Sequence, residues 1–135
     1  IFCLTSSLSF MKRGCLNVLI TNPRDLPGFV KELRRWKFSV MTGVNTLFKG
    51  LLNTPGFEKL DFSSLKIAVG GGASVQKPVA EGWEKVTGKC LMEAYGLTEC
   101  TTGVTTNTPQ NWRFGTVGQA FPGTELRLAE DGEAR

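Results

Sequence analysis

The segment from residue 65 to residue 94 limits the possible folds most, because it alternates the patterns of a strand, a loop, a helix and a second strand. Residues 65–69 form a short strand-like run that is apolar except for Lys66, and Gly70, Gly71 and Gly72 follow directly. A helix with an apolar stripe comes next and is closed by Gly88; the stripe consists of Val79, Trp83 and Val86. Residues 90–94 follow as a second run, apolar except for Glu93. This order predicts two parallel strands joined by a right-handed helical crossover.

The same alternation extends toward the N-terminus. Residues 15–20 are an almost unbroken apolar run, which predicts a strand buried on both faces, as in a parallel sheet. A helix capped by Asp25 is expected next, then a strand at residues 38–41 and an amphipathic helix at residues 44–52. The predicted fold class is therefore α/β: a layered, largely parallel sheet with flanking helices.

The two ends of the chain carry weaker patterns. Residues 2–10 are apolar with no charged segment before them, so they indicate a helix rather than a signal peptide. Residues 99–122 are rich in Gly, Thr, Asn and Pro and are expected to form a functional loop, followed by a last strand at residues 124–128. The turn pair Asp131-Gly132 indicates a hairpin, and both ends look cut.

Composition argues against several classes of function. The chain has no histidine, and its four cysteines lack C-x-x-C spacing, so a zinc site has little support and reduced thiols are expected. No stretch approaches the roughly 20 apolar residues that span a bilayer. A net charge of +4 leaves a non-catalytic nucleotide- or nucleic-acid-binding module open as an alternative. The clustered basic residues share a helix with Glu32, however, and predict a solvated face; they are Lys31, Arg34, Arg35 and Lys37.

A five-residue segment after the last apolar run of the alternation combines several binding groups. It consists of Tyr95, Gly96, Leu97, Thr98 and Glu99, at the carboxyl end of an expected strand, where open α/β sheets bind ligands. An aromatic face stacks on a base, a hydroxyl donates to a phosphate oxygen, and a carboxylate holds a hard cation. Each residue alone also fits a structural role, as a core aromatic, a helix cap or a first-turn acid. Together with the glycine loop, they predict a nucleotide crevice.

This segment resembles the Tyr-Gly-x-Thr-Glu motif of the adenylate-forming enzymes, the superfamily of acyl-CoA synthetases, peptide-synthetase adenylation domains and luciferases. Further segments are similar to bacterial long-chain fatty acid–CoA ligases, at residues 19–25, 42–48, 60–65 and 70–72. The similarity covers essentially the whole chain. It implies that residues 1–135 are an internal fragment of the large N-terminal AMP-binding domain, with no second domain present.

The resemblance implies ATP-dependent activation of a fatty acid to an acyl-adenylate, followed by thioester formation with coenzyme A. ATP or AMP and Mg²⁺ are the implied cofactors, and coenzyme A is the co-substrate; no nucleic acid is expected. Adenylation of an aryl or amino acid is the alternative. The implied location is the cytoplasm, and any contact with the inner face of the membrane would be peripheral. The fragment alone is expected to be inactive, because the family's phosphate loop and catalytic lysine fall outside it.

The family motif also implies roles for single residues. Tyr95 would stack on adenine, Thr98 would contact the α-phosphate, and Glu99 would bind Mg²⁺. The implied nucleotide crevice is lined by Gly72, Ala73, Ser74, Glu93, Ala94, Tyr95, Gly96, Leu97 and Thr98. The implied acyl pocket is bordered by Val44, Gly70 and Gly71. Ser74 and Ala120 stand where the family often has proline, and both leave the backbone φ less restricted.

Overall fold

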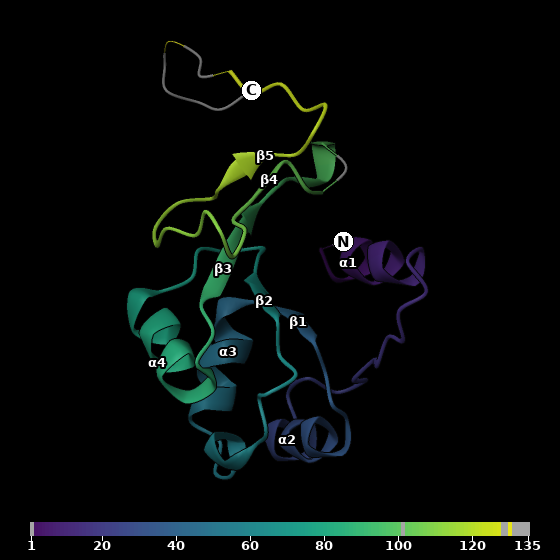
Figure 1. The fold of residues 1–135 in the computed structure, drawn as a ribbon, viewed down its shortest axis with the longest axis vertical. Coiled ribbons are helices and arrows are strands. Elements are labelled where there is room, and N and C mark those ends of the chain that lie inside the picture. The colour runs from purple at the N-terminus through teal and green to yellow at the C-terminus, as the bar shows by residue number, and fades with distance from the viewer. Residues whose placement is uncertain (1, 101, 128–129, 131–135) are drawn as a thin grey trace.

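The structure of the chain, a computed structural model, describes residues 2–100, 102–127 and 130 (Figure 1). The helices are α1 (Phe2–Met11), α2 (Leu26–Arg35), α3 (Asn45–Leu52) and α4 (Lys77–Thr87), with short 3₁₀ turns η1 (Phe57–Lys59) and η2 (Thr98–Cys100). The strands are β1 (Val40–Gly43), β2 (Ile67–Gly70), β3 (Leu91–Tyr95), β4 (Thr105–Thr106) and β5 (Gln119–Ala120). None of the described helices has the length and apolar character needed to cross a membrane.

The strands form one sheet in the order β1-β2-β3-β4-β5. β1, β2 and β3 are parallel, with α3 joining the first pair and α4 joining the second, as predicted. β4 runs antiparallel to β3 and to β5. Figure 1 shows α3 and α4 side by side, with β4 and β5 extending from the far end of β3. The predicted α/β class, with a mostly parallel sheet and flanking helices, is confirmed.

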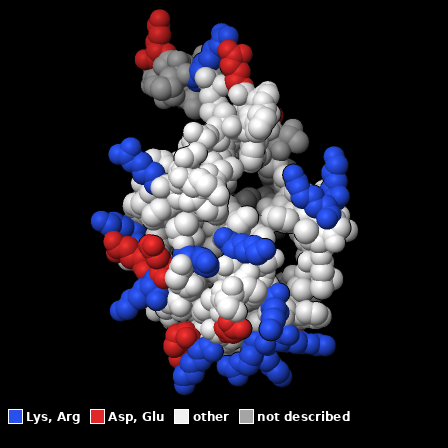
Figure 2. All heavy atoms as spheres, in the orientation of Figure 1, with Lys and Arg blue, Asp and Glu red and all other residues white. Residues whose placement is uncertain are grey.

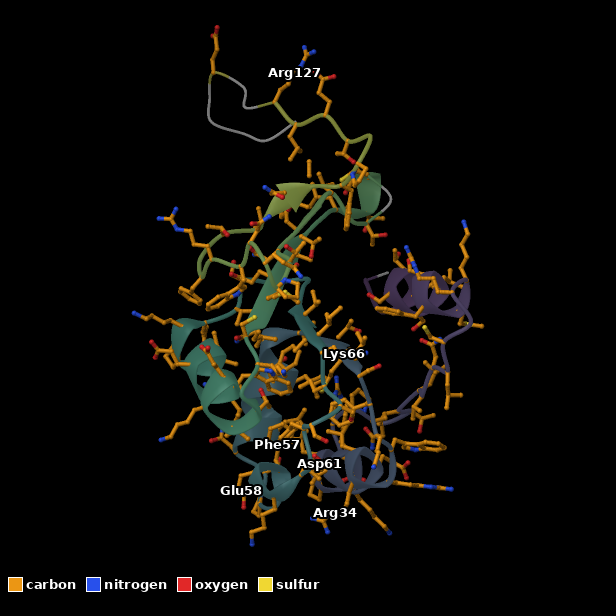
Figure 3. All side chains as sticks on the ribbon, viewed as in Figure 1. Arg34, Phe57, Glu58, Asp61, Lys66 and Arg127 are labelled. Atoms are coloured by element: carbon orange, nitrogen blue, oxygen red, sulfur yellow. The ribbon has the colours of Figure 1, made fainter. Side chains whose placement is uncertain are left out.

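An aromatic cluster forms the centre of the core between α3, α4 and η1. Trp83 and Phe48 are fully buried, and their rings meet edge to face with centroids 4.8 Å apart. Phe57, labelled in Figure 3, adds a tilted contact with Trp83 at 5.6 Å, and Phe62 packs on Phe57 at 5.2 Å. Burial of each such ring removes roughly 150–250 Å² of surface from water, and burial of apolar surface stabilises the fold by about 25 cal/mol per Å². This cluster fixes α4, and therefore the loop before it, against α3.

Local capping signals explain why the predicted helices form. The Asp25 carboxylate accepts a hydrogen bond of 3.0 Å from the Gly28 amide and caps α2. Gly88 has a φ of 69°, and its amide donates to the Glu84 carbonyl at 2.8 Å, which ends α4 where the sequence predicts. A helix also spans the N-terminal apolar residues, as α1.

The prediction of a strand at residues 15–20 is wrong. These residues form no strand, and Leu16 and Leu19 are 78% and 76% exposed. A strand requires backbone partners, and within the described ranges no backbone hydrogen bond joins residues 16–20 to another segment. A cavity of about 640 Å³ lies between this segment, α2 and β1; Figure 2 shows the molecule hollowed on the side of α1.

The C-terminal predictions are corrected in two places. Residues 124–127 form no strand, because the chain turns at Gly123 and then finds no partner strand among the described residues. Residue 128 and the Asp131-Gly132 hairpin signal lie outside the described residues. The expected loop at residues 99–122 contains the two-residue strands β4 and β5, and is therefore partly ordered by the sheet.

Candidate functional site

The carboxyl ends of β1, β2 and β3 are in register and form one edge of the sheet. Gly43 lies opposite Gly70, and Gly70 lies opposite Glu93. The Gly71 amide donates to the Gly43 carbonyl at 3.0 Å, which extends the pairing one residue past β2. β3 continues two residues beyond Glu93 to Tyr95. The glycine loop and the Tyr95 segment thus begin on neighbouring strands at the edge where ligands bind in α/β sheets.

The loop after β2 folds back over the end of its own strand. A Cβ atom on Gly70 would lie 2.4 Å from the Val75 side chain, so only glycine leaves room for Val75 to close over the strand. Val75 is 5% exposed, whereas Gly72, Ala73 and Ser74 are exposed. The Gln76 amide donates to the Asn45 side chain at 3.0 Å and ties the starts of α4 and α3 together. This leaves three small residues available to a ligand above the sheet edge.

The segment after β3 closes on itself through backbone hydrogen bonds. The Thr102 amide donates to the Leu97 carbonyl at 2.9 Å, and the Val104 amide donates to the Tyr95 carbonyl at 2.9 Å. The backbone on the two sides of this turn approaches so closely that a Cβ atom on Gly96 would lie 1.3 Å from the Thr102 carbonyl oxygen. Gly96 is therefore required by close backbone approach, since any side chain would displace Thr102.

This tight turn presents the motif side chains to solvent. Tyr95 is 36% exposed and Leu97 49% exposed, and Thr98 and Glu99 are exposed on η2. The Thr5 and Thr102 hydroxyls lie 2.6 Å apart, so α1 contacts the far side of the same turn. An aromatic ring, a hydroxyl and a carboxylate are thus accessible within five residues.

The structure brings the two predicted halves of the nucleotide crevice together. The Val75 amide donates to the Glu93 carboxylate at 2.8 Å, which links the glycine loop directly to β3. Ala94 pairs with Thr106 and is half-buried, so its backbone is used by the sheet. The carboxylate of Glu93 is therefore engaged with the protein, while that of Glu99 takes part in no ion pair among the described residues.

The residues expected at the acyl pocket lie beside the glycine loop. Val44 is 39% exposed, and a Cβ atom on Gly72 would lie 3.6 Å from its side chain. Gly70 and Gly71 are buried. The 640 Å³ cavity lies on the other side of β1 and is lined by none of these three residues. This cavity and the predicted site therefore lie in different places, and the sheet edge remains the predicted position of the site.

Asn107, which no sequence pattern singles out, holds the segments around the motif together. Asn107 is 3% exposed, and its amide group donates to the Glu93 carbonyl at 3.2 Å and to the Thr116 carbonyl at 2.5 Å. Its side-chain oxygen accepts from the Thr116 hydroxyl at 3.2 Å. The only signal in the sequence was an asparagine within a threonine-rich run, which is also typical of an ordinary loop.

Basic side chains gather at the opposite end of the molecule from the motif. Figure 2 shows Lys and Arg over the end that carries α2, and Figure 3 labels Arg34, Glu58 and Asp61 there, farthest from β4 and β5. The hydrogen bonds from Ser63 lower the pKa of Asp61. The cluster of Lys31, Arg34, Arg35 and Lys37 is exposed, as the solvated-face interpretation expects. The basic cluster thus lies on and just after α2, apart from the segment Tyr95–Glu99.

Relatives of this chain are named ligases. A family model described as "AMP-binding enzyme" matches residues 1–135. The long-chain-fatty-acid–CoA ligase of Yersinia pestis is 54% identical over 134 residues, which are 97% of this chain and 24% of that protein. The ligase of the same name from Haemophilus influenzae is 45% identical over the same shares of each chain. This chain thus spans about a quarter of the length of the curated relatives that it matches.

Solved structures share the fold. An anthranilate CoA ligase in complex with anthranoyl-AMP matches 87% of this chain and 23% of its own, with a TM-score of 0.76 and 23% identity. A benzoate CoA ligase from Burkholderia xenovorans matches 90% of this chain and 25% of its own, with a TM-score of 0.74 and 22% identity. At these identities the likeness concerns the fold alone. The match of the family model over the whole chain shows that the chain belongs to the family of AMP-binding enzymes.

Proposed function

We propose that this chain is part of a long-chain fatty acid–CoA ligase and forms one wall of its nucleotide site. The observation that carries the proposal is the 54% identity to a long-chain-fatty-acid–CoA ligase over 97% of the chain. The geometry agrees, because the Tyr95–Glu99 segment is exposed at the carboxyl edge of the sheet beside an exposed glycine loop. The proposed substrates are a fatty acid, ATP and coenzyme A.

The roles proposed for the motif follow from what each group offers. The accessible Tyr95 ring would stack on adenine, and the Thr98 hydroxyl would donate to an oxygen of the α-phosphate. The Glu99 carboxylate fits Mg²⁺, which is commonly held by one or two carboxylates together with substrate phosphates. When bound, Mg²⁺ would offset phosphate charge while the fatty acid carboxylate attacks the α-phosphorus and pyrophosphate leaves. Positioning is thus the main contribution of these residues.

Exchanging Glu99 for glutamine in the parent ligase tests this proposal. Glu99→Gln keeps the shape but removes the charge that would hold Mg²⁺, so we expect at least a 100-fold loss of Mg²⁺-dependent acyl-adenylate formation. Glu81→Gln is the matched control, because Glu81 is an exposed carboxylate in a surface pair with Lys77 at 3.8 Å. Normal activity of Glu99→Gln over a Mg²⁺ titration would refute the assigned role.

The acid that is activated is a separate question. The structural neighbours that act on anthranilate or benzoate share only 23% and 22% identity with this chain, whereas the fatty acid ligase of Yersinia pestis shares 54%. We therefore place the parent protein with the fatty acid ligases rather than the aryl acid ligases. Pyrophosphate exchange measured across long-chain, aryl and amino acids decides between them. A response to aryl acids alone would contradict the choice.

The proposed location of the parent is the cytoplasm, where it would meet its lipid substrate at the inner face of the membrane. Cell fractionation of the parent, with and without fatty acid, tests this. The 135 residues alone are proposed to be inactive, since the resemblance places essential groups outside them. Acyl-CoA formation by the isolated chain would refute that statement.

A further inference from the structure

Glu93 occupies the junction of the two loops that form the candidate site. It is the last residue of β3 that pairs with β2, where it lies opposite Gly70. Its carboxylate accepts from the Val75 amide at 2.8 Å. Its backbone carbonyl accepts from the Asn107 backbone amide at 3.0 Å and from the Asn107 side chain at 3.2 Å. From its position on β3, Glu93 therefore joins the glycine loop to the segment that contains Asn107.

The side chain of Glu93 is partly shielded from solvent and forms a hydrogen bond within the protein. The residues before it on β3, Leu91 and Met92, are 1% and 2% exposed, and Glu93 itself is half-buried. A partly desolvated carboxylate is stabilised when it accepts a hydrogen bond, and such charge-assisted bonds are about twice as strong as neutral ones. Within the described part of the chain, Glu93 forms no ion pair. The Val75 amide is thus its side-chain partner.

This hydrogen bond sets the separation between the two loops. Val75 ends the exposed run Gly72–Ser74 and is itself buried at 5% exposure, so its amide marks where the glycine loop returns to the core. Tyr95 follows Glu93 by two residues on the same strand. Moving Val75 away from Glu93 would therefore widen the gap between the small residues and the aromatic ring, and a ligand that contacts both loops would lose one of them.

We propose that Glu93 is a positioning residue for the nucleotide: it holds the glycine loop at the correct distance from Tyr95 and Thr98 without contacting the metal. This inference rests on the proposed function and refines it, because the family resemblance implies only that Glu93 lines the crevice. Direct contact with the ligand and positioning of the glycine loop require different properties of residue 93. A metal or phosphate contact depends on the charge of residue 93, whereas the bond from Val75 needs only an acceptor oxygen at the same place.

The test uses the parent ligase with three variants at one position. Glu93→Ala removes the acceptor, and we expect KM for ATP to rise about 10- to 100-fold, as for loss of a hydrogen bond to a charged group. Glu93→Gln keeps an acceptor oxygen in place and is expected to recover most of that loss, although its neutral hydrogen bond is weaker. Glu93→Asp keeps the charge but is one methylene too short, so it should resemble Glu93→Ala. KM for the acid should change less than KM for ATP in Glu93→Ala and Glu93→Asp.

The outcomes separate this inference from the proposed function. If wild-type parent shows no ATP-dependent adenylation of any acid, the proposed function fails. If the wild type is active but Glu93→Gln falls as far as Glu93→Ala, the charge is required and the positioning role is refuted. An unchanged KM for ATP in Glu93→Ala would refute it as well. If Glu93→Ala does not fold, as judged by circular dichroism, the comparison of Glu93→Gln with Glu93→Asp gives the same decision.

Discussion

Replacing Gly96 with alanine tests whether the turn after β3 must be as tight as the structure shows. The new Cβ atom would lie 1.3 Å from the Thr102 carbonyl oxygen and 2.3 Å from its carbonyl carbon. An ordinary contact begins near 3.4 Å, so Thr102 would have to move by about 2 Å. The obstructing atoms belong to the backbone, so a change of rotamer does not relieve the clash.

The cost follows from what holds Thr102 in place. A 2 Å shift breaks the hydrogen bond from Thr102 to Leu97 and strains the one from Val104 to Tyr95, both 2.9 Å long. Each is worth about 1 kcal/mol, and overpacking adds about 1–3 kcal/mol. In Gly96→Ala the exposed turn moves to relieve the clash while the core stays in place. ATP binding would then have to return the turn to its original, now strained, conformation. A cost of about 3 kcal/mol corresponds to roughly 100-fold weaker ATP binding.

The assay is equilibrium binding of ATP to the parent ligase, with urea denaturation alongside. Gly115→Ala is the matched control: Gly115 has a φ of 74° but no neighbouring atom within 4 Å of an added Cβ. That variant pays about 1–2 kcal/mol of backbone strain without a clash at the motif, and should bind ATP within about three-fold of wild type. Near-normal ATP affinity in Gly96→Ala would refute the reasoning, since the turn would then tolerate a displaced Thr102.

Three further predictions concern stability and reactivity. Asn107→Ala should cost about 2–3 kcal/mol in urea denaturation, because it leaves the Thr116 carbonyl unpaired; the exposed Asn111→Ala should stay within about 0.5 kcal/mol. Trp83→Phe should cost under about 1.5 kcal/mol against 3–5 for Trp83→Ala, because the indole N–H has no partner among the described residues. Burial raises the pKa of the Cys90 thiol, so alkylation mapped by mass spectrometry near pH 8 should be slower there than at the exposed Cys15. Because the folded-state pKa of Cys90 is raised, its contribution to stability is fully present below the ordinary pKa of a thiol and is lost as pH rises through the folded-state pKa. The urea midpoint should therefore fall at alkaline pH.

The helices could be predicted from the sequence because their signals are local. Asp25 caps α2 through a residue three positions away, and Gly88 ends α4 through a residue four positions away. Apolar spacing within α3 and α4 selects the faces that meet in the aromatic cluster. Such signals involve residues within one or two turns of each other, so a single sequence contains them whole.

The contacts that organise the site could not be predicted in the same way. Glu93 and Val75 are 18 residues apart, and Asn107 is 14 residues from Glu93. No period or turn motif couples such positions, and their partners are backbone groups that every residue carries. The two-residue strands β4 and β5 are also too short to show alternation. The sequence therefore placed Tyr95–Glu99 at a sheet edge but not the hydrogen bonds that hold it there.

The incorrect strand prediction at residues 15–20 leads to a test of its own, because apolar pattern and exposure disagree there. Leu16 and Leu19 are more than 75% exposed, although the run they belong to is typical of a strand covered on both faces. β1 is the edge strand of the described sheet, and the 640 Å³ cavity lies between it and this segment. A longer chain of this family has further segments that could cover both faces, so we expect residues 16–20 to pair with β1 in the parent ligase.

Amide hydrogen exchange of the parent should then show slow exchange across residues 16–20, comparable with β2, since paired amides exchange only through opening. Exchange as fast as in an exposed loop would mean that the segment stays unpaired there too, and that its apolar side chains serve a surface other than the sheet.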